Sequence, residues 1–203
     1  MIKTKEELKE YVQSDNSWFK ETGGKTRIIN SISSDNKRIL KKFLVLLRKS
    51  EYHLNNTEGS RYHTYLYWYY EGRKNRLGRK LGIEIYPNCF GKGLEIWHAG
   101  GIVVNPAVRA GENCILHGGN CIGNKGSVNV NPVLGDNVSL LANATIIGGS
   151  HIGNNVIISA NTNLINETIP DNCIVFGRSL HPEIHFKTEK EMLERTAYLW
   201  GWA

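Results

Sequence analysis

From residue 104 onward, every sixth residue of the chain is aliphatic over eleven successive positions. Because 40% of the residues are hydrophobic, chance would give such a run about once in 20,000 trials, so the spacing reflects structure. The segment LGDNV at residues 134–138 also recurs as IGNNV at residues 152–156, which adds a period of 18. The series of sixth residues is Val104, Ala110, Leu116, Ile122, Val128, Leu134, Leu140, Ile146, Ile152, Ile158 and Leu164.

This double period has a direct structural meaning. Three short strands of about six residues each make one triangular coil, and coils stack with parallel strand pairing about 4.8 Å apart. The aliphatic residue of each hexad fills the interior, and Gly and Asn suit the corners, where φ is often positive. The repeat predicts a parallel β-helix over residues 83–178, a solenoid in which each coil mainly contacts its neighbours. We expect the left-handed form, which departs from the usual right-handed crossover rule.

One segment interrupts the regular composition. Residues 123–132, GNKGSVNVNP, are polar and rich in turn-forming residues, which favours a protruding loop. Val128 nevertheless keeps the six-residue count. The spacing permits both arrangements.

Residues 1–82 follow a helical pattern instead. Thr4 and Glu7 have the spacing of a capping box, and Ser34 or Asp35 can cap a second helix with apolar residues at helical spacing. A third segment is rich in aromatic residues and ends in a basic run. We therefore expect an α-helical N-terminal domain over this range.

The tail at residues 179–203 follows the last coil. Thr188 and Glu191 again have capping-box spacing, which predicts a short C-terminal helix. The fold class is thus mainly β, with a helical domain before the β-helix and one helix after it.

The composition excludes several classes of protein. The net charge of +6 is modest for a nucleic-acid-binding protein, so we expect no nucleic-acid partner. The polar N-terminus does not resemble a signal peptide, and no stretch approaches the ~20 apolar residues that span a bilayer. The four cysteines include no C-x-x-C pair, so free thiols in a reducing cytoplasm are expected.

The stretch IWHAGG at residues 96–101 departs from the repeat. His98 lies six residues before Val104, so a strict count would point its imidazole into the apolar interior, at a cost. Gly100 and Gly101 allow the backbone to turn and to reset the phase, which would point His98 outward.

His98 could be a catalytic base, a metal ligand or a buried structural residue. His98, His117 and His151 are spaced 19 and 34 residues apart, without the close pair of a typical zinc site. We therefore expect no bound metal.

The segment GIEIYPNCFGKGLEIWHAGGIVVNPAV, placed between a helical domain and hexapeptide coils, resembles the serine O-acetyltransferases among the hexapeptide-repeat acyltransferases. The closer likeness is to their relatives in polysaccharide gene clusters, the colanic-acid and capsule O-acetyltransferases. The resemblance covers roughly residues 81–178. It implies acetyl-CoA as the acyl donor and a homotrimer, or a dimer of trimers, with active sites between subunits.

The resemblance also implies roles for particular residues. His98 stands at the position of the general base, which takes the proton of an acceptor hydroxyl as its oxygen attacks the thioester. An imidazole titrates near neutral pH and suits this task. Glu84 takes the place of the carboxylate that orients the base, and Glu95 is the alternative. The cofactor-binding positions correspond to Ala142, Ala160, Gly123, Lys125, Gly177 and Arg178, where Arg178 would meet a phosphate.

The acceptor side departs from the serine-specific pattern. Trp97 replaces an aspartate before the base, and Val130 and Asn131 replace an Arg-His pair before Pro132. A zwitterionic amino acid needs both of its charges satisfied once it leaves water. A tryptophan face and an amide instead suit a sugar, and His117 could also contact the acceptor or the thioester oxygen. We therefore expect an O-acetyltransferase whose acceptor is a sugar of a capsular polysaccharide or exopolysaccharide.

Two alternatives stay open. One is a serine O-acetyltransferase of cysteine biosynthesis, with a small-molecule hydroxyl acceptor. The other is a non-catalytic β-helix scaffold, because a fold does not fix a function.

Overall fold

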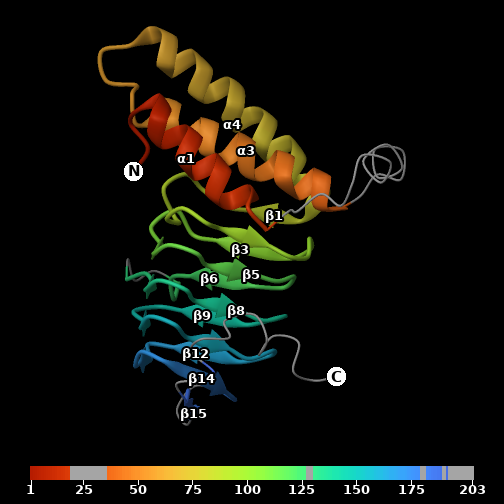
Figure 1. Cartoon of the computed structure of the whole chain (residues 1–203), viewed down its shortest axis with the longest axis vertical. Helices are drawn as coiled ribbons and strands as arrows, with labels where there is room; N and C mark the ends of the chain where they lie inside the picture. Colours follow the sequence, from red (N-terminus) through yellow and green to blue (C-terminus); the bar gives the residue numbers. More distant parts are fainter. Residues whose placement is uncertain (19–35, 127–129, 179–181, 189–190, 192–203) are drawn as a thin grey trace.

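The computed structural model describes residues 1–18, 36–126, 130–178, 182–188 and 191. Figure 1 shows a layer of helices that covers one end of a stack of β-strand coils. The helices are α1 (Lys5–Asn16), α3 (Asn36–Leu54) and α4 (Arg61–Leu81). The described residues before β1 are therefore mainly helical, as their pattern predicts.

The ends of the helices follow from local residues. The predicted capping box of α1 is present: Glu7 N donates to Thr4 Oγ1 at 3.1 Å and Thr4 N donates to a Glu7 carboxylate oxygen at 2.9 Å. Ser60 caps α4 by accepting from His63 N. Helix α4 ends at Leu81 and is capped by Gly82, whose φ of 64° is a left-handed conformation that glycine adopts without strain. The predicted caps of the second helix, Ser34 and Asp35, lie outside the described residues.

The remaining elements form a β-helix with three faces. Sheet A contains β1, β3, β6, β9 and β12; sheet B contains β4, β7, β10 and β13; sheet C contains β2, β5, β8, β11, β14 and β15. All pairs are parallel except β14 with β15. The strands are β1 (Ile83–Glu84), β2 (Glu95–Ile96), β3 (Ile102–Val104), β4 (Arg109–Ala110), β5 (Ile115–Leu116), β6 (Cys121–Gly123), β7 (Val133–Leu134), β8 (Ser139–Leu140), β9 (Thr145–Ile147), β10 (His151–Ile152), β11 (Ile157–Ile158), β12 (Asn163–Ile165), β13 (Thr168–Ile169), β14 (Cys173–Phe176) and β15 (Glu183–Phe186).

The aliphatic residue of each hexad fills the interior of the coils. Nine of the eleven positions in the series are buried and Ala110 is half-buried, while Val128 lies outside the described residues. Because each coil places these side chains above those of the next, they form one continuous apolar core. The predicted parallel β-helix is confirmed.

Asparagine ladders hold one corner of the stack. Asn113, Asn137, Asn155 and Asn172 all have φ between 56° and 59°, a region that asparagine tolerates better than most residues. Their side-chain amides hydrogen-bond from coil to coil at 3.2, 3.0 and 2.8 Å. The sequence period of these residues is therefore a period of corner geometry.

The strand register resolves the status of residues 123–132. After the segment, the next pairs are 18 residues apart, as in Val133 with His151, and those of the last coil are 17 apart, as in His151 with Thr168. Across it, all three sheets pair residues 24 apart, as in Cys121 with Thr145. One coil thus contains six extra residues between β6 and β7. Because this excess is one hexad, the phase of the coils is the same on both sides of the segment.

The register also resolves the phase at His98. Ile96 pairs with Leu116, 20 residues later, so the turn between β2 and β3 contains two more residues than a regular corner. Ile96 takes the buried position and His98 is exposed. The outward orientation expected from the two glycines is confirmed.

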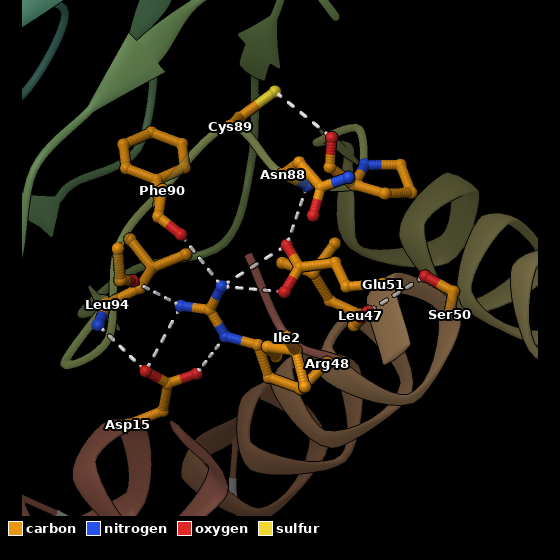
Figure 2. Close-up of polar contacts among 12 residues, drawn as sticks. Ile2, Asp15, Leu47, Arg48, Ser50, Glu51, Asn88, Cys89, Phe90 and Leu94 are labelled. Atoms are coloured by element: carbon orange, nitrogen blue, oxygen red, sulfur yellow. Dashed lines mark hydrogen bonds and ion pairs between the residues drawn. The ribbon is translucent and has the colours of Figure 1, made fainter. Parts of the chain in front are cut away.

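A buried ionic cluster joins the helices to the first coil (Figure 2). Arg48 of α3, fully buried, donates to Asp15 at 2.6 Å and to Glu51 at 2.9 Å. It also donates to the carbonyl oxygens of Phe90 and Gly91 at 3.0 and 2.6 Å. The cluster therefore fixes the chain segment that leads into β2, the strand directly before His98.

The far end of the β-helix has a strand that the sequence did not predict. β15 turns back and pairs antiparallel with β14, which covers the last parallel edge of sheet C. After it, Thr188 and Glu191 make both hydrogen bonds of the predicted capping box. The rest of the predicted C-terminal helix lies outside the described residues. Within the described residues, no helix is long and apolar enough to cross a membrane.

Candidate active site

His98 lies at the corner where sheet C passes into sheet A. The corners of successive coils stack here through backbone hydrogen bonds: Asn143 N donates to Gly118 O at 3.0 Å, and Asn161 N donates to Ala142 O at 2.9 Å. Gly118 lies directly beside His98, because a Cβ added at Gly118 would be 3.9 Å from the Cβ of His98. The corner thus forms a column, defined by His98, Gly118, Ala142, Ala160 and Gly177, which we call the site column.

Glycines allow the close packing at the top of this column. A Cβ at Gly82 would lie 3.2 Å from the Cα of Gly100, and one at Gly101 would lie 3.3 Å from the Cα of Gly119. All four glycines have positive φ, where other residues are strained. The IWHAGG turn therefore needs its glycines both for backbone conformation and for contact with the neighbouring turns.

Aromatic rings lie beside His98 and its neighbour Trp97. The ring centroid of His117 lies 5.5 Å from that of His98 and 5.1 Å from that of Trp97. Trp18, just after α1, stacks on Trp97 at 6.3 Å with an interplanar angle of 26°. The structure thus brings together Trp97, His98 and His117, which the sequence analysis proposed as site residues. Trp18 was missed, since its only signal was an isolated tryptophan beyond a helix.

His117 is a neutral imidazole held in place by its own turn. Its backbone N–H donates to Asn120 Oδ1 at 2.7 Å. Burial, with a smaller contribution from the charge of His98, lowers the pKa of His117 to about 4. Within the described residues its Nε2 is buried without a hydrogen-bond partner. A bound substrate could supply that partner.

The two carboxylates considered for orienting His98 have other partners. Glu84 is exposed on sheet A and accepts a hydrogen bond from Tyr86 Oη at 2.9 Å. Glu95 accepts from Trp97 Nε1 at 2.9 Å. In the described part of the chain, neither carboxylate hydrogen-bonds to His98. Glu95 fixes the indole of Trp97, and an orienting role for Glu84 stays a prediction.

The expected cofactor residues divide between two corners. Ala142, Ala160 and Gly177 are exposed in the site column, and Arg178 follows, bridged to Asn163 of sheet A. Gly123 and Lys125 lie instead at the corner between sheets A and B, where Gly123 O accepts from Gly148 N at 2.8 Å.

Asn131 lies near the same second corner, because its neighbour Val130 packs against Gly149. Within one chain, therefore, Trp97 and His117 accompany His98, whereas Asn131 does not. Among the described residues, no group of three or more His, Cys, Asp or Glu side chains is arranged to hold a metal ion.

Comparison with known proteins gives a consistent likeness. Residues 131–166 match the family described as bacterial transferase hexapeptide (six repeats). A serine acetyltransferase of Synechococcus elongatus is 31% identical over 126 residues, which are 57% of this chain and 51% of that protein. The chain thus spans about half the length of the curated relatives it matches.

Solved structures show the same fold. Serine acetyltransferase of Neisseria gonorrhoeae superposes with a TM-score of 0.62 and 22% identity, covering 92% of this chain and 69% of that one. A serine acetyltransferase in complex with CoA gives a TM-score of 0.65 and 18% identity, covering 89% and 71%. The comparisons support the likeness to serine acetyltransferases. They do not support the closer likeness to capsule and colanic-acid enzymes that the sequence suggested.

Proposed function

We propose that the chain is an acetyl-CoA-dependent O-acetyltransferase of the serine acetyltransferase type, with His98 as the general base. The observation that carries the proposal is the exposed imidazole of His98 at the top of the site column, with His117 beside it. His98 accepts the proton of the acceptor hydroxyl, and the hydroxyl oxygen attacks the thioester carbonyl. The C–S bond then breaks, CoA leaves, and the acetyl group stays on the oxygen as an ester.

The site column suits the donor. Ala142 and Ala160 are small and exposed, so an extended pantetheine arm could approach the backbone groups of the corner. Arg178, exposed beyond the last coil, would meet a phosphate at the nucleotide end. The unpaired Nε2 of His117 could donate a hydrogen bond to the thioester oxygen, where negative charge develops.

A homotrimer would complete the site. Lys125 and Asn131 lie at or near the corner between sheets A and B, whereas His98 lies at the corner between sheets C and A. Two corners of one triangular prism cannot meet, but a three-fold ring places one corner of each copy against another corner of the next. We therefore propose active sites between subunits, in a cytoplasmic enzyme.

Serine is the first candidate acceptor, because the matching relatives carry that name. The carboxylate of Glu95, 2.9 Å from the Trp97 indole nitrogen, supplies a negative charge that Trp97 itself lacks and that an ammonium group could use. A sugar is the second candidate. It is favoured by the Trp97 indole, which Trp18 stacks and Glu95 orients, as in sites that bind the apolar face of a sugar.

Release of CoA, followed with a thiol reagent, tests both levels of the proposal. Acetyl-CoA is offered with serine, with monosaccharides, with a capsular polysaccharide or alone. Acceptor-dependent release is expected, and its absence with every acceptor would favour the non-catalytic scaffold. If serine alone accelerates release, the sugar acceptor is excluded; if only sugars do, serine is.

A further inference from the structure

The positive charge of the chain is concentrated in α3 and α4. These two helices contain twelve lysines and arginines but only two acidic residues, Glu51 and Glu71, a net charge of +10. The whole chain has +6, so the remainder carries −4. Both acidic residues are buried and paired, with Arg48 and Lys74. Arg48 and Lys74 are buried as well, so the net charge of +10 belongs to the ten remaining cations, and no carboxylate of these helices reaches the surface.

The exposed face of α4 combines cations with aromatic rings. Tyr62, Tyr65 and Trp68 are 67%, 70% and 66% exposed, and Tyr69 is 43% exposed. Large aromatic side chains are seldom this exposed over two turns of one helix. The exposed cations of the same helix are Arg61, Arg73, Arg76, Arg79 and Lys80. None of its exposed residues is acidic.

A basic groove borders this face, between α3 and α4. It consists of two adjoining hollows of about 610 and 640 Å³. Arg38, Lys41 and Lys42 line one bank, and Arg73, Arg76 and Lys80 line the other. No carboxylate lines either hollow, and within the described residues none of these six cations forms a salt bridge. Their charges are available to an external anion.

We infer that the exposed face of α4 binds an anionic phospholipid membrane surface. Tyrosine and tryptophan rings lie favourably at the headgroup level of a bilayer, and clusters of four to eight cations attract anionic lipids. A membrane would engage both the aromatic and the basic residues of the helix. Figure 1 shows that α4 begins at the end of the molecule farthest from the β-helix, so a planar surface can reach it.

Two other occupants fit less well. A linear polyanion in the groove would use the cations but leave Tyr62, Tyr65 and Trp68 in water. A second copy of the chain, packed face to face, would place like charges opposite each other. Of the three occupants, only a membrane surface would contact both the cations and the aromatic rings of this face.

Co-sedimentation with phospholipid vesicles tests this inference without any need for enzymatic activity. The chain should bind vesicles that contain phosphatidylglycerol more tightly than vesicles of phosphatidylcholine alone, and salt should weaken the difference. Arg73→Gln with Arg76→Gln should reduce binding on the order of 25-fold, since each cation contributes roughly fivefold. Tyr65→Ser with Trp68→Ser should reduce binding at high salt as well.

Lys5→Gln with Lys9→Gln is the matched control, because both lysines are exposed on α1; its binding should stay within about threefold of wild type. Equal binding to neutral and anionic vesicles, or equal losses in the control, would overturn the inference. Vesicle binding at the wild-type level by the variant Tyr65→Ser with Trp68→Ser would also overturn the inference. Tighter binding of single-stranded DNA would then identify a polyanion as the occupant, and an altered oligomeric state in sedimentation would identify a second copy of the chain.

Discussion

Removal of the Arg48 guanidinium should detach the helical layer from the β-helix. In Arg48→Met, Asp15 and Glu51 lose their cation in a fully buried site, and two backbone carbonyl oxygens lose a donor. Asp15 keeps the N–H groups of Gly93 and Leu94, at 2.8 and 2.9 Å. Loss of one partner of a buried ion pair costs about 3–5 kcal/mol. This is a large part of the ~5–15 kcal/mol that stabilises a typical protein.

Lys92→Met is the matched comparison. Lys92 links the same two layers through Glu10 at 2.6 Å, but its side chain is 33% exposed and that of Glu10 is 56% exposed. Such exposed pairs contribute little to stability. We therefore expect Arg48→Met to lose much more unfolding free energy than Lys92→Met, because its ion pairs are buried.

Urea unfolding followed by tryptophan fluorescence measures the difference. Trp18 of the helical layer stacks on Trp97 of the first coil, so the emission reports whether the two layers are docked. Glu51→Gln added to Arg48→Met should recover part of the loss, because it removes one of the buried negative charges. A loss below about 1 kcal/mol for Arg48→Met, or equal losses for Arg48→Met and Lys92→Met, would refute the reasoning.

Three further predictions concern the coils and the site. The pKa of His117 is lowered to about 4, so between about pH 6.5 and 4 the unfolded chain binds more protons. The free energy of unfolding should fall as pH drops through this window, and His117→Gln should flatten the fall in urea titrations. Asn137→Ala should be less stable than Asn137→Gly by about 1–2 kcal/mol, because φ is 57° there; equal melting would contradict this. Glu84→Gln should slow turnover less than loss of His98, and a larger effect of Glu95→Gln would identify Glu95 as the orienting carboxylate.

The sequence period was enough to predict the β-helix because each repeat of the sequence corresponds to one strand of a coil. Each sixth residue meets its equivalent in the next coil, so Leu140 lies over Leu116 and under Ile158. The status of residues 123–132 could not be predicted. An insertion of six residues leaves the phase unchanged, and only the pairing of Cys121 with Thr145 reveals it.

The candidate site was predicted in part. The glycines after His98 signalled that the phase resets, and the outward imidazole follows from them. Contacts between the helices and the coils, in contrast, could not be predicted from any local sequence pattern. Trp18 follows the end of α1 and stacks on Trp97, and Arg48 reaches carbonyl oxygens more than 40 residues away. Such contacts depend on how the helical layer docks, which no local pattern encodes. Glu84 was proposed because it takes the place of the orienting carboxylate in the resemblance. It lies on sheet A and accepts a hydrogen bond from Tyr86, and its role stays a prediction.

Acetyl-CoA cleavage by His98→Ala tests the central claim most directly. His151→Ala is the matched control, because His151 is also an exposed histidine on the β-helix, on strand β10. With the most active acceptor, the rate of CoA release should fall about 10²–10⁴-fold in His98→Ala and stay near wild type in His151→Ala, with both variants folded. Wild-type turnover by folded His98→Ala would remove His98 as the general base and contradict the account.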